Sequence, residues 1–500
     1  LVFQWCQDYV RQPDGPEAGE RWQFTAEQIR FLHYLYAVDD RGRFLWSRAV
    51  LRRAKGWGKS PLMAAIALAE LCGPVRCDGF DAQGNPVGVP ASRPWMQIAG
   101  VSEKQTNNTM SMVLAMIAES PIIDDYGLDP GLTRVFAAGG GRLEPITASA
   151  PTAEGARPTF CVLDETHHWV RANGGHKLAE VIRRNLGKSR DGAARSVETT
   201  NAHEMGVESV AERSYDAWQA QAAGRTARST ILYDSREAPV GVDLADETEL
   251  MAALNATYGD STWVDLERVR DEVYDPGTPP SEARRFYLNQ MSVADDAWLS
   301  PIEWDRQAVP ELVPGAGEQI TLGFDGSKSD DHSALIGCLV DVDHLFEIKV
   351  WEPDARTGEV DRADIDRAVR AAFETYDVVG FFSDLHPWES YVDRWAEELG
   401  AGLCVRSMTR HPIAFDMRSR QAEFTSACES LHDGIVEEQV THCGSTRFRQ
   451  HAHNARMASN RWGVTVRKEH RESARKIDAV PAAVLARLAR QQYLALPKAR

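Results

Sequence analysis

The stretch Leu51-Arg52-Arg53-Ala54-Lys55-Gly56-Trp57-Gly58-Lys59-Ser60 is typical of a phosphate-binding loop without its first glycine. The usual pattern is G-x-x-x-x-G-K-[ST], and Arg53 stands where the leading glycine belongs. Backbone N–H groups of such a loop can wrap a phosphate, Lys59 can reach its oxygens, and Ser60 can hold Mg²⁺. We expect ATP to be bound by the following residues of the stretch: Arg53, Lys55, Gly56, Gly58, Lys59 and Ser60.

An apolar strand that ends in two acids supplies the rest of an ATPase site. The segment 160–163, Phe-Cys-Val-Leu, is followed by Asp164 and Glu165. A carboxylate at this point can share the Mg²⁺ of Ser60, and the next one can orient the attacking water. Asp164 is therefore the predicted metal partner and Glu165 the predicted catalytic base. The alternative, a chance G-K-S beside a chance acidic turn, is disfavoured because both motifs occur together.

Further polar residues extend this interpretation. Gln28, three residues after Thr25, can pair with an adenine edge through its amide, although an ordinary polar helix residue fits equally well. Thr200 and Asn201 end a strand pattern and could sense the γ-phosphate, with a plain β-turn as the alternative. The cations that could contact the transferred phosphoryl group are Arg53, Lys55, Arg142 and Arg157. Each of these cations could equally be a solvated surface residue.

Length and composition are those of a multidomain globular protein. The 500 residues exceed one ordinary core, and fractions of 43% hydrophobic and 26% charged residues are typical of soluble chains. The net charge of −17 argues against nonspecific coating of nucleic acid, whereas residues 441–500 carry 13 Lys and Arg against 3 Asp and Glu. Eight scattered cysteines disfavour structural zinc and disulfides, and no apolar run suits a membrane. We expect a cytoplasmic protein. Its basic last 60 residues are compatible with a local DNA groove, and solvated helix faces are the equally good alternative.

The order of strand and helix patterns predicts three parts. Residues 1–240 alternate strands with helices, which predicts an α/β domain of the P-loop NTPase type, a parallel sheet flanked by helices. Within it, residues 73–90 are a predicted surface loop with Gly, Pro and Asp, and residues 137–158, rich in Gly, Ala and Pro, are expected to be mobile. Residues 241–316 are expected to be a helical, irregular, proline-rich connecting region. Residues 317–500 begin with a three-stranded meander and then alternate helices and strands, the order of a ribonuclease-H-like fold.

Three aspartates in the last part point to metal chemistry. Asp325 and Asp384 each end an apolar strand, and Asp478 opens a helix of Ala, Val and Leu. In a ribonuclease-H-like fold these positions converge, and three carboxylates can bind two Mg²⁺ or Mn²⁺ ions that activate water and stabilise the leaving oxygen of a phosphodiester. A helix cap or turn role is the alternative for each aspartate taken alone.

Other residues near these aspartates are weaker candidates. Asp331 could support a metal ion. His451 and His453 could line a DNA groove or lie beside the metal, although surface histidines with satisfied hydrogen bonds are more common. Backbone phosphates are the natural partners of the basic residues around this site. They are Arg447, Arg449, Arg456, Arg467, Lys468, Arg471, Arg475 and Lys476.

Over nearly its whole length the chain resembles the large subunit of tailed-bacteriophage terminases. The segments that carry the resemblance are 53–60, 163–165, 199–201, 323–326, 383–384 and 476–480. The resemblance implies an N-terminal ATPase that translocates double-stranded DNA into a procapsid and a C-terminal metal-dependent nuclease that cuts concatemeric DNA. It implies that Lys59 and Ser60 bind nucleotide and Mg²⁺, that Asp164 supports the metal ion and that Glu165 is the catalytic base. Thr200 and Asn201 would couple hydrolysis to movement. The nuclease metal ligands would be Asp325, Asp384 and Asp478.

The resemblance also implies partners and a place of action. These are double-stranded DNA, a small terminase subunit, the portal ring and a pentameric ring of large subunits, with no membrane. The protein would act in the bacterial host cytoplasm, docked transiently on the procapsid, and would be absent from the mature virion. Many relatives carry an arginine three residues before the second glycine of the loop, where this chain has Lys55. Arg53 and Lys55 therefore compete for the contact with the γ-phosphate.

Two other functions fit parts of the sequence. One is an ATP-dependent translocase of DNA repair or restriction fused to a nuclease. Such translocases usually have a second motor domain, for which residues 239–314 are too short. The other is a DNA-binding assembly scaffold with a relic ATP site, which the intact Lys59, Asp164 and Glu165 disfavour.

Overall fold

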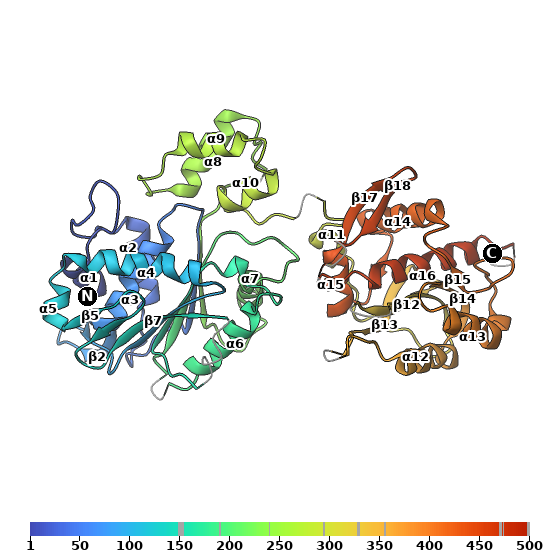
Figure 1. Cartoon of the computed structure of the whole chain (residues 1–500), viewed down its shortest axis with the longest axis horizontal. Coiled ribbons are helices and arrows are strands. Elements are labelled where there is room, and N and C mark those ends of the chain that lie inside the picture. The colour runs from blue at the N-terminus through green and yellow to red at the C-terminus, as the bar shows by residue number, and fades with distance from the viewer. Residues whose placement is uncertain are drawn as a thin grey trace. The chain divides into compact units, whose positions relative to one another are not determined.

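The computed structural model contains two compact units, Leu1–Ser292 and Val293–Arg500, each with its own central sheet (Figure 1). The structure describes residues 1–148, 155–189, 192–239, 241–293, 296–327, 331–354, 357–469, 473 and 475–497. The predicted connecting region, residues 241–316, is shared between the two units. No helix within the described ranges is long and apolar enough to cross a membrane.

The first unit contains the predicted parallel sheet. Its strands are β1 (Arg48–Arg52), β2 (Arg76–Phe80), β3 (Pro86–Val89), β4 (Trp95–Gly100), β5 (Leu128–Pro130), β6 (Val135–Ala137), β7 (Arg142–Thr147), β8 (Phe160–Leu163), β9 (Arg195–Thr200) and β10 (Ile231–Ser235). Eight of them form one sheet in the order β10-β1-β9-β8-β4-β7-β6-β5. All neighbours from β10 to β7 are parallel, which confirms the prediction, and β6 and β5 add an antiparallel edge.

The predicted loop at residues 73–90 contains the separate hairpin of β2 and β3, so this prediction was wrong. Residues 137–158, which were expected to be mobile, include β7. This strand pairs along its whole length with β4, a partner that is distant in sequence. Such pairing overrides the weak β-propensity of a short polar segment.

Helices cover both faces of the sheet (Figure 1). They are α1 (Val2–Tyr9), α2 (Ala26–Leu35), α3 (Lys59–Cys72), α4 (Glu103–Ala118), α5 (Ile122–Tyr126), η2 (Thr166–His168), α6 (Gly175–Leu186) and α7 (Val210–Ala222). Phe160 and Val162 of β8 pack in the core that contains α3 and α4, whereas Leu163 packs with Leu178 and Ile182 of α6. Alternate side chains of β8 therefore face opposite helix layers, as the pleat of a strand requires.

A small helical part completes the first unit. It consists of α8 (Glu247–Tyr258), α9 (Leu266–Tyr274) and α10 (Pro280–Phe286). These helices share a hydrophobic cluster that includes Leu250, Leu254 and Tyr258 and also Ala54 of the phosphate-binding loop. The helical part thus packs directly on the loop.

The second unit contains the predicted meander. Its main sheet has the order β15-β14-β11-β12-β13-β16. The strands are β11 (Gln319–Asp325), β12 (Ser333–Leu339), β13 (His344–Trp351), β14 (Asp377–Asp384), β15 (Ala414–Phe415) and β16 (Thr441–His442), and a separate hairpin joins β17 (Arg456–Asn460) and β18 (Gly463–Arg467). The antiparallel run β11-β12-β13 and the parallel pairing of β14 with β11 match the order expected of a ribonuclease-H-like fold.

Helices also enclose this second sheet. They are α11 (Pro301–Arg306), α12 (Arg362–Thr375), α13 (Glu389–Leu399), η3 (Gly400–Gly402), α14 (Gln421–Val436), α15 (Thr446–Asn454) and α16 (Ala479–Leu494). Leu335 packs in the core with α12 and α13, whereas its neighbour Ile336 packs with α14 and α16. Because successive side chains of a strand point to opposite faces, these helix pairs lie on opposite faces of the sheet.

The contact between β11 and α16 is close enough to require glycine at position 323. A Cβ atom on Gly323 would come within 1.9 Å of the Ala482 carbonyl oxygen and 2.5 Å of the Ala486 nitrogen. We expect Gly323→Ala to lower the free energy of unfolding of the second unit by about 3 kcal/mol, since overpacking here meets backbone atoms. Denaturant unfolding measures this, with Gly402→Ala as the control because its Cβ meets nothing within 4 Å. Equal effects of the two substitutions would contradict the prediction.

Candidate ATPase and nuclease sites

The phosphate-binding loop connects β1 to α3. Gly56 and Gly58 have φ angles of 85° and 94°, left-handed conformations that glycine adopts without strain. Gly58 is the N-cap of α3, and Lys59 and Ser60 are its first residues. The amino end of a 14-residue helix therefore begins in the loop, as a phosphate site requires.

Lys59 is buried inside the loop. Its Nζ donates to the carbonyl oxygens of Arg53 at 3.0 Å and Ala54 at 2.9 Å. Burial lowers the pKa of Lys59 to about 8, although the charges of Asp164 and Glu165 act in the opposite direction. Lys59 and the two acids at the end of β8 are thus electrostatic neighbours, as predicted.

Asp164 is held by two threonines from different elements. Thr199 of β9 donates to its Oδ1 at 2.6 Å, and Thr109 of α4 donates to its Oδ2 at 2.7 Å. Burial raises the pKa of Asp164 in spite of these hydrogen bonds. The sequence did not indicate Thr109, but its position four residues after Gln105 places both side chains on one face of α4.

Glu165 follows in a left-handed backbone conformation, with φ of 53°. Such a conformation is uncommon for a residue other than glycine and clusters at functional sites. The Glu165 carboxylate accepts from Gln105 Nε2 at 3.3 Å, and its backbone N–H donates to Thr199 Oγ1 at 3.2 Å. These contacts fix Glu165 beside Asp164, where a base for water would lie.

The end of β9 contacts both the loop and the segment after Glu165. Asn201 Nδ2 donates to the Arg53 carbonyl at 2.9 Å, and the Arg53 N–H donates to the Thr200 carbonyl at 3.1 Å. The Asn201 N–H donates to His167 Nδ1 at 3.3 Å. Thr200 and Asn201 therefore contact the phosphate-binding loop, and Asn201 also contacts His167; a role in sensing the γ-phosphate stays a prediction.

The side chain of Arg53 is engaged away from the phosphate position. Its Nη2 forms an ion pair of 2.5 Å with Asp234, and its guanidinium lies 5.0 Å from the Trp57 ring centre. Glu27 lies 3.7 Å from its Nε. Because the charge of Arg53 is compensated inside the core, this geometry argues against its predicted contact with the γ-phosphate. Lys55 is exposed and forms no ion pair with a residue that the structure describes.

The other two arginine candidates lie far from this loop along the sheet. Arg142 is the first residue of β7 and stacks on the Trp95 ring at 3.6 Å. Arg157 is exposed and precedes β8. Both lie toward the amino ends of parallel strands, whereas the loop follows the carboxyl end of β1. Contact with a neighbouring subunit stays a prediction for these two residues.

A cavity of about 450 Å³ opens beside the loop. Its lining includes Phe24, Thr25, Gln28, Gly58, Pro61 and Trp263. Gln28 Oε1 accepts from the Thr25 N–H at 3.1 Å, and the two residues form a capping box for α2. The capping role is therefore confirmed, and adenine recognition by Gln28 stays a prediction.

The helical part holds the loop from outside. Tyr258 donates from its hydroxyl to the Lys55 carbonyl at 2.8 Å, and Trp263 Nε1 donates to the Gly56 carbonyl at 3.0 Å. The sequence did not predict these two contacts. Tyr258 and Trp263 belong to no motif with a fixed sequence spacing from the phosphate-binding loop.

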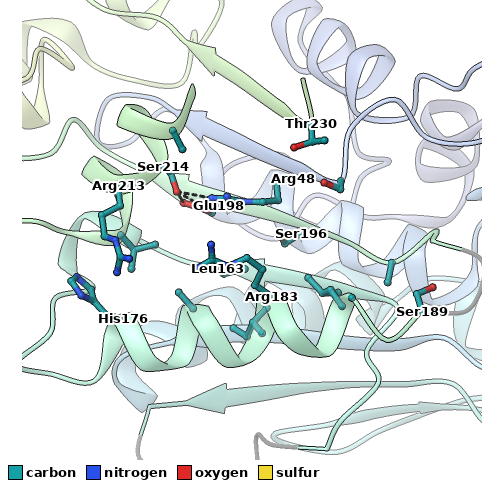
Figure 2. A pocket seen from close by; sticks show the side chains of 18 of the residues that line it. Arg48, Leu163, His176, Arg183, Ser189, Ser196, Glu198, Arg213, Ser214 and Thr230 are labelled. Carbon is teal, nitrogen blue, oxygen red and sulfur yellow. Dashed lines mark hydrogen bonds and ion pairs between the residues drawn. The ribbon is translucent and has the colours of Figure 1, made fainter. Parts of the chain in front are cut away.

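A larger cavity, of about 620 Å³, lies between the sheet and helices α6 and α7 (Figure 2). In its wall the Glu198 carboxylate accepts from Arg48 at 3.0 Å and from Ser214 at 2.8 Å. None of the predicted ATPase residues lines this cavity. The volume of a cavity therefore does not identify the ATP site, and the predicted site follows from the residues of the phosphate-binding loop.

The three predicted aspartates of the nuclease converge. Asp325 and Asp384 end β11 and β14, which are parallel neighbours with Phe324 opposite Ser383. Burial, and then the charges of Asp478 and Asp384, hold the pKa of Asp325 well above its usual range. Burial also raises the pKa of Asp384, and burial with the charge of Asp331 raises that of Asp478 to about 7.

Carboxylate oxygens are the ligand type that Mg²⁺ and Mn²⁺ prefer, and metal binding by these three aspartates stays a prediction. Asp478 Oδ2 is buried and has no hydrogen-bond partner. Within the described part of the chain, no three His, Cys, Asp or Glu side chains form a preassembled metal site. The raised pKa values and the unpartnered oxygen show carboxylates that a cation would stabilise.

Asp331, a weaker candidate from the sequence, belongs to this cluster. Lys468 Nζ donates to its Oδ2, and Lys476 Nζ lies 3.3 Å from its Oδ1. Although burial favours the neutral form, the bond from Lys468 lowers the pKa of Asp331. His451 accepts the Ala479 N–H at 2.9 Å and so holds the start of α16 beside Asp478.

Several of the predicted DNA-binding cations are engaged in ion pairs within the second unit. Arg449 and His453 contact Asp305, and Arg456 and Arg467 contact Asp296. Arg447 and Arg475 pair with Glu352 and Glu469. Arg471 lies outside the described residues. Contact with DNA phosphates stays a prediction for this group.

Comparison with known proteins places this chain among phage proteins. It is 40% identical to the gene 13 protein of Mycobacterium phage L5 and 39% identical to that of Mycobacterium phage D29, over all of this chain and 92% of each relative. The chain belongs to this gene 13 protein family. No family model matches it.

The fold of this gene 13 family member is that of a large terminase. The crystal structure of the HK97 bacteriophage large terminase matches with a TM-score of 0.53 and 17% identity, over 98% of both chains. The predicted fold, an ATPase of the P-loop type followed by a ribonuclease-H-like unit, is confirmed by this match and by the two sheets.

The contrast between Arg53 and Lys55 can be tested by substitution in this protein. We expect Arg53→Leu to lower the free energy of unfolding by about 3 kcal/mol, because the buried ion pair with Asp234 is broken and only the more exposed Arg30 still pairs with that acid. Lys55→Ala should change it by less than about 0.5 kcal/mol, the usual range for a surface residue. The same Lys55→Ala protein should lose ATPase activity by about 100-fold if Lys55 contacts the phosphate. A stable Arg53→Leu protein beside a fully active Lys55→Ala protein would reverse the assignment.

Proposed function

We propose that this chain is the large subunit of a phage terminase, which moves double-stranded DNA into a procapsid by ATP hydrolysis and cuts that DNA with a metal-dependent nuclease. The supporting observation is the pairing of two acid clusters in one chain. One lies beside the phosphate-binding loop, and the other lies at the adjacent ends of β11 and β14. A lone ATPase or a lone nuclease would need only one of them.

The ATPase unit has a side chain for each task of phosphoryl transfer. Lys59 would bind the phosphate oxygens, and Ser60 with Asp164 would hold Mg²⁺, which neutralises charge on the phosphates. Glu165 would orient the attacking water. Release of phosphate would reach Thr200 and Asn201 through the Arg53 carbonyl, which both Lys59 and Asn201 contact.

The nuclease unit would bind Mg²⁺ or Mn²⁺ through Asp325, Asp384 and Asp478. A divalent ion held by these residues would activate water and stabilise the leaving oxygen of a phosphodiester. The sequence predicts two such ions. Asp331 would support the set from the side of Lys468 and Lys476, whose contacts with it are formed in the structure.

The proposed partners follow from the proposed function. They are a small terminase subunit, the portal protein and further copies of this chain, with a pentamer as the expected ring. Membership of a mycobacteriophage protein family supports action inside a bacterial host, in its cytoplasm and transiently on the procapsid.

Removal of the proposed base should separate the two activities. We expect Glu165→Ala to reduce DNA-stimulated ATP hydrolysis at least about 100-fold, the usual contribution of a positioned base. Cleavage of plasmid DNA with Mn²⁺ should persist, because the nuclease acids are untouched. Loss of cleavage with intact ATPase would show that Glu165 does not belong to a separate ATPase site.

The complementary change should have the opposite effect. We expect Asp384→Ala to abolish metal-dependent plasmid cleavage while ATP hydrolysis continues. Asp377→Ala, an exposed substitution at the other end of β14, serves as the control and should cut normally. If both variants cut plasmid as the unchanged protein does, the acid cluster is not the nuclease centre.

A further inference from the structure

A lysine side chain occupies the nuclease acid cluster. Lys468 Nζ donates to Asp331 Oδ2 and lies 3.8 Å from Asp478 Oδ1. The side chain is 18% exposed, so its charge acts inside the cluster and is little screened by solvent. The ammonium group therefore lies between two carboxylates of the proposed metal-binding set.

The backbone at Lys468 is held in place. Lys468 directly follows β18, and Arg467 donates to the carbonyl oxygens of Lys468 at 3.1 Å and Glu469 at 2.7 Å. Arg467 also donates to the Met457 carbonyl of β17 and pairs with Asp296. The position of the ammonium group is thus set by the β17–β18 hairpin as well as by its own ion pairs.

The contacts within the cluster are unequal. Asp331 forms ion pairs with both Lys468 and Lys476, and Asp478 Oδ1 forms one with Lys468. Asp478 Oδ2 has no hydrogen-bond partner and is buried. No ion pair of Asp325 or Asp384 with Lys, Arg or His is found among the described residues. Among the described residues, the close ion pairs of the cluster are therefore formed by Asp331 and Asp478 and not by Asp325 or Asp384.

We infer that Lys468 is a resident cation of the nuclease site, taking one of two cation positions, the one between Asp331 and Asp478. The remaining position, formed by Asp325, Asp384 and the free oxygen of Asp478, then binds a single divalent ion. This inference rests on the proposed nuclease function. It replaces the two-ion count predicted from the sequence with one ion and one lysine.

The physical reason is the competition between a tethered ammonium and a free ion. A divalent ion entering between Asp331 and Asp478 would have to displace Lys468, leaving its ammonium group partly buried beside that ion. Like charges at such short separation repel strongly where solvent is limited. Removal of the Lys468 charge should therefore open this position to a second ion.

The test counts bound Mn²⁺ on the full-length chain without nucleotide or DNA, by electron paramagnetic resonance of the free ion. We expect one tight equivalent for the unchanged protein and two for Lys468→Met, which keeps the length of the side chain and removes its charge. Lys349→Met should still bind one, because Lys349 pairs with Asp364 on the surface of the same unit. Asp325→Asn provides the background of ions bound elsewhere.

Each outcome decides the inference. Two equivalents in the unchanged protein would overturn it, and this result needs no variant to fold. One equivalent of tightly bound Mn²⁺ in both the unchanged protein and the Lys468→Met variant would also overturn it, provided that the two proteins have the same melting temperature. If the Lys468→Met variant does not fold, Lys468→Gln repeats the test. Failure of the proposed function is a separate result, namely that the unchanged protein cuts no plasmid with Mn²⁺ at any concentration.

Discussion

Both units bury carboxylates at the carboxyl ends of their central strands, and the cost of burying that charge shapes each site. An ionised carboxylate in a protein interior is strongly disfavoured unless it is hydrogen-bonded or paired. In the first unit Asp164 accepts from two threonines, and Asp234 pairs with Arg53 and Arg30. In the second unit Asp478 Oδ2 is buried without a hydrogen-bond partner, so a bound cation would stabilise the ionised carboxylates there.

The phosphate-binding loop is held by its carbonyl oxygens as much as by its N–H groups. Lys59, Asn201, Tyr258 and Trp263 all donate to carbonyls within residues 53–56. These donors come from the loop helix, the end of β9 and the helical part. Residues 53–56 are therefore in contact with the start of α3, with the end of β9 and with the helical part.

Much of this arrangement was predictable because the periodic and apolar patterns are strong. The parallel strands of the first unit, the meander of the second, and the places of Asp164, Glu165, Asp325, Asp384 and Asp478 at strand and helix ends all follow from local sequence. Carboxyl ends of neighbouring parallel strands meet at one edge of a sheet, which brings such acids together. Strand β7 was missed because its partner β4 is distant in sequence. The local hairpin β2–β3 was missed because its Gly, Pro and Asp residues are typical of a loop.

The ion-pair partners of the cations at each site could not be predicted from local sequence. Arg53 lies inside the loop motif, so it was one of the candidates for the γ-phosphate contact, yet its partner Asp234 comes from β10 and is 181 residues away. Lys468 lies among basic residues that suit DNA phosphates, yet it contacts Asp331, 137 residues away. A cationic side chain forms its ion pair with the acid that the fold brings nearest to it. The position of the cation relative to a sequence motif does not predict which acid that is. A cationic side chain can therefore bind a ligand only if it has not already formed an ion pair within the protein. Arg53 and Lys468 have both formed such pairs.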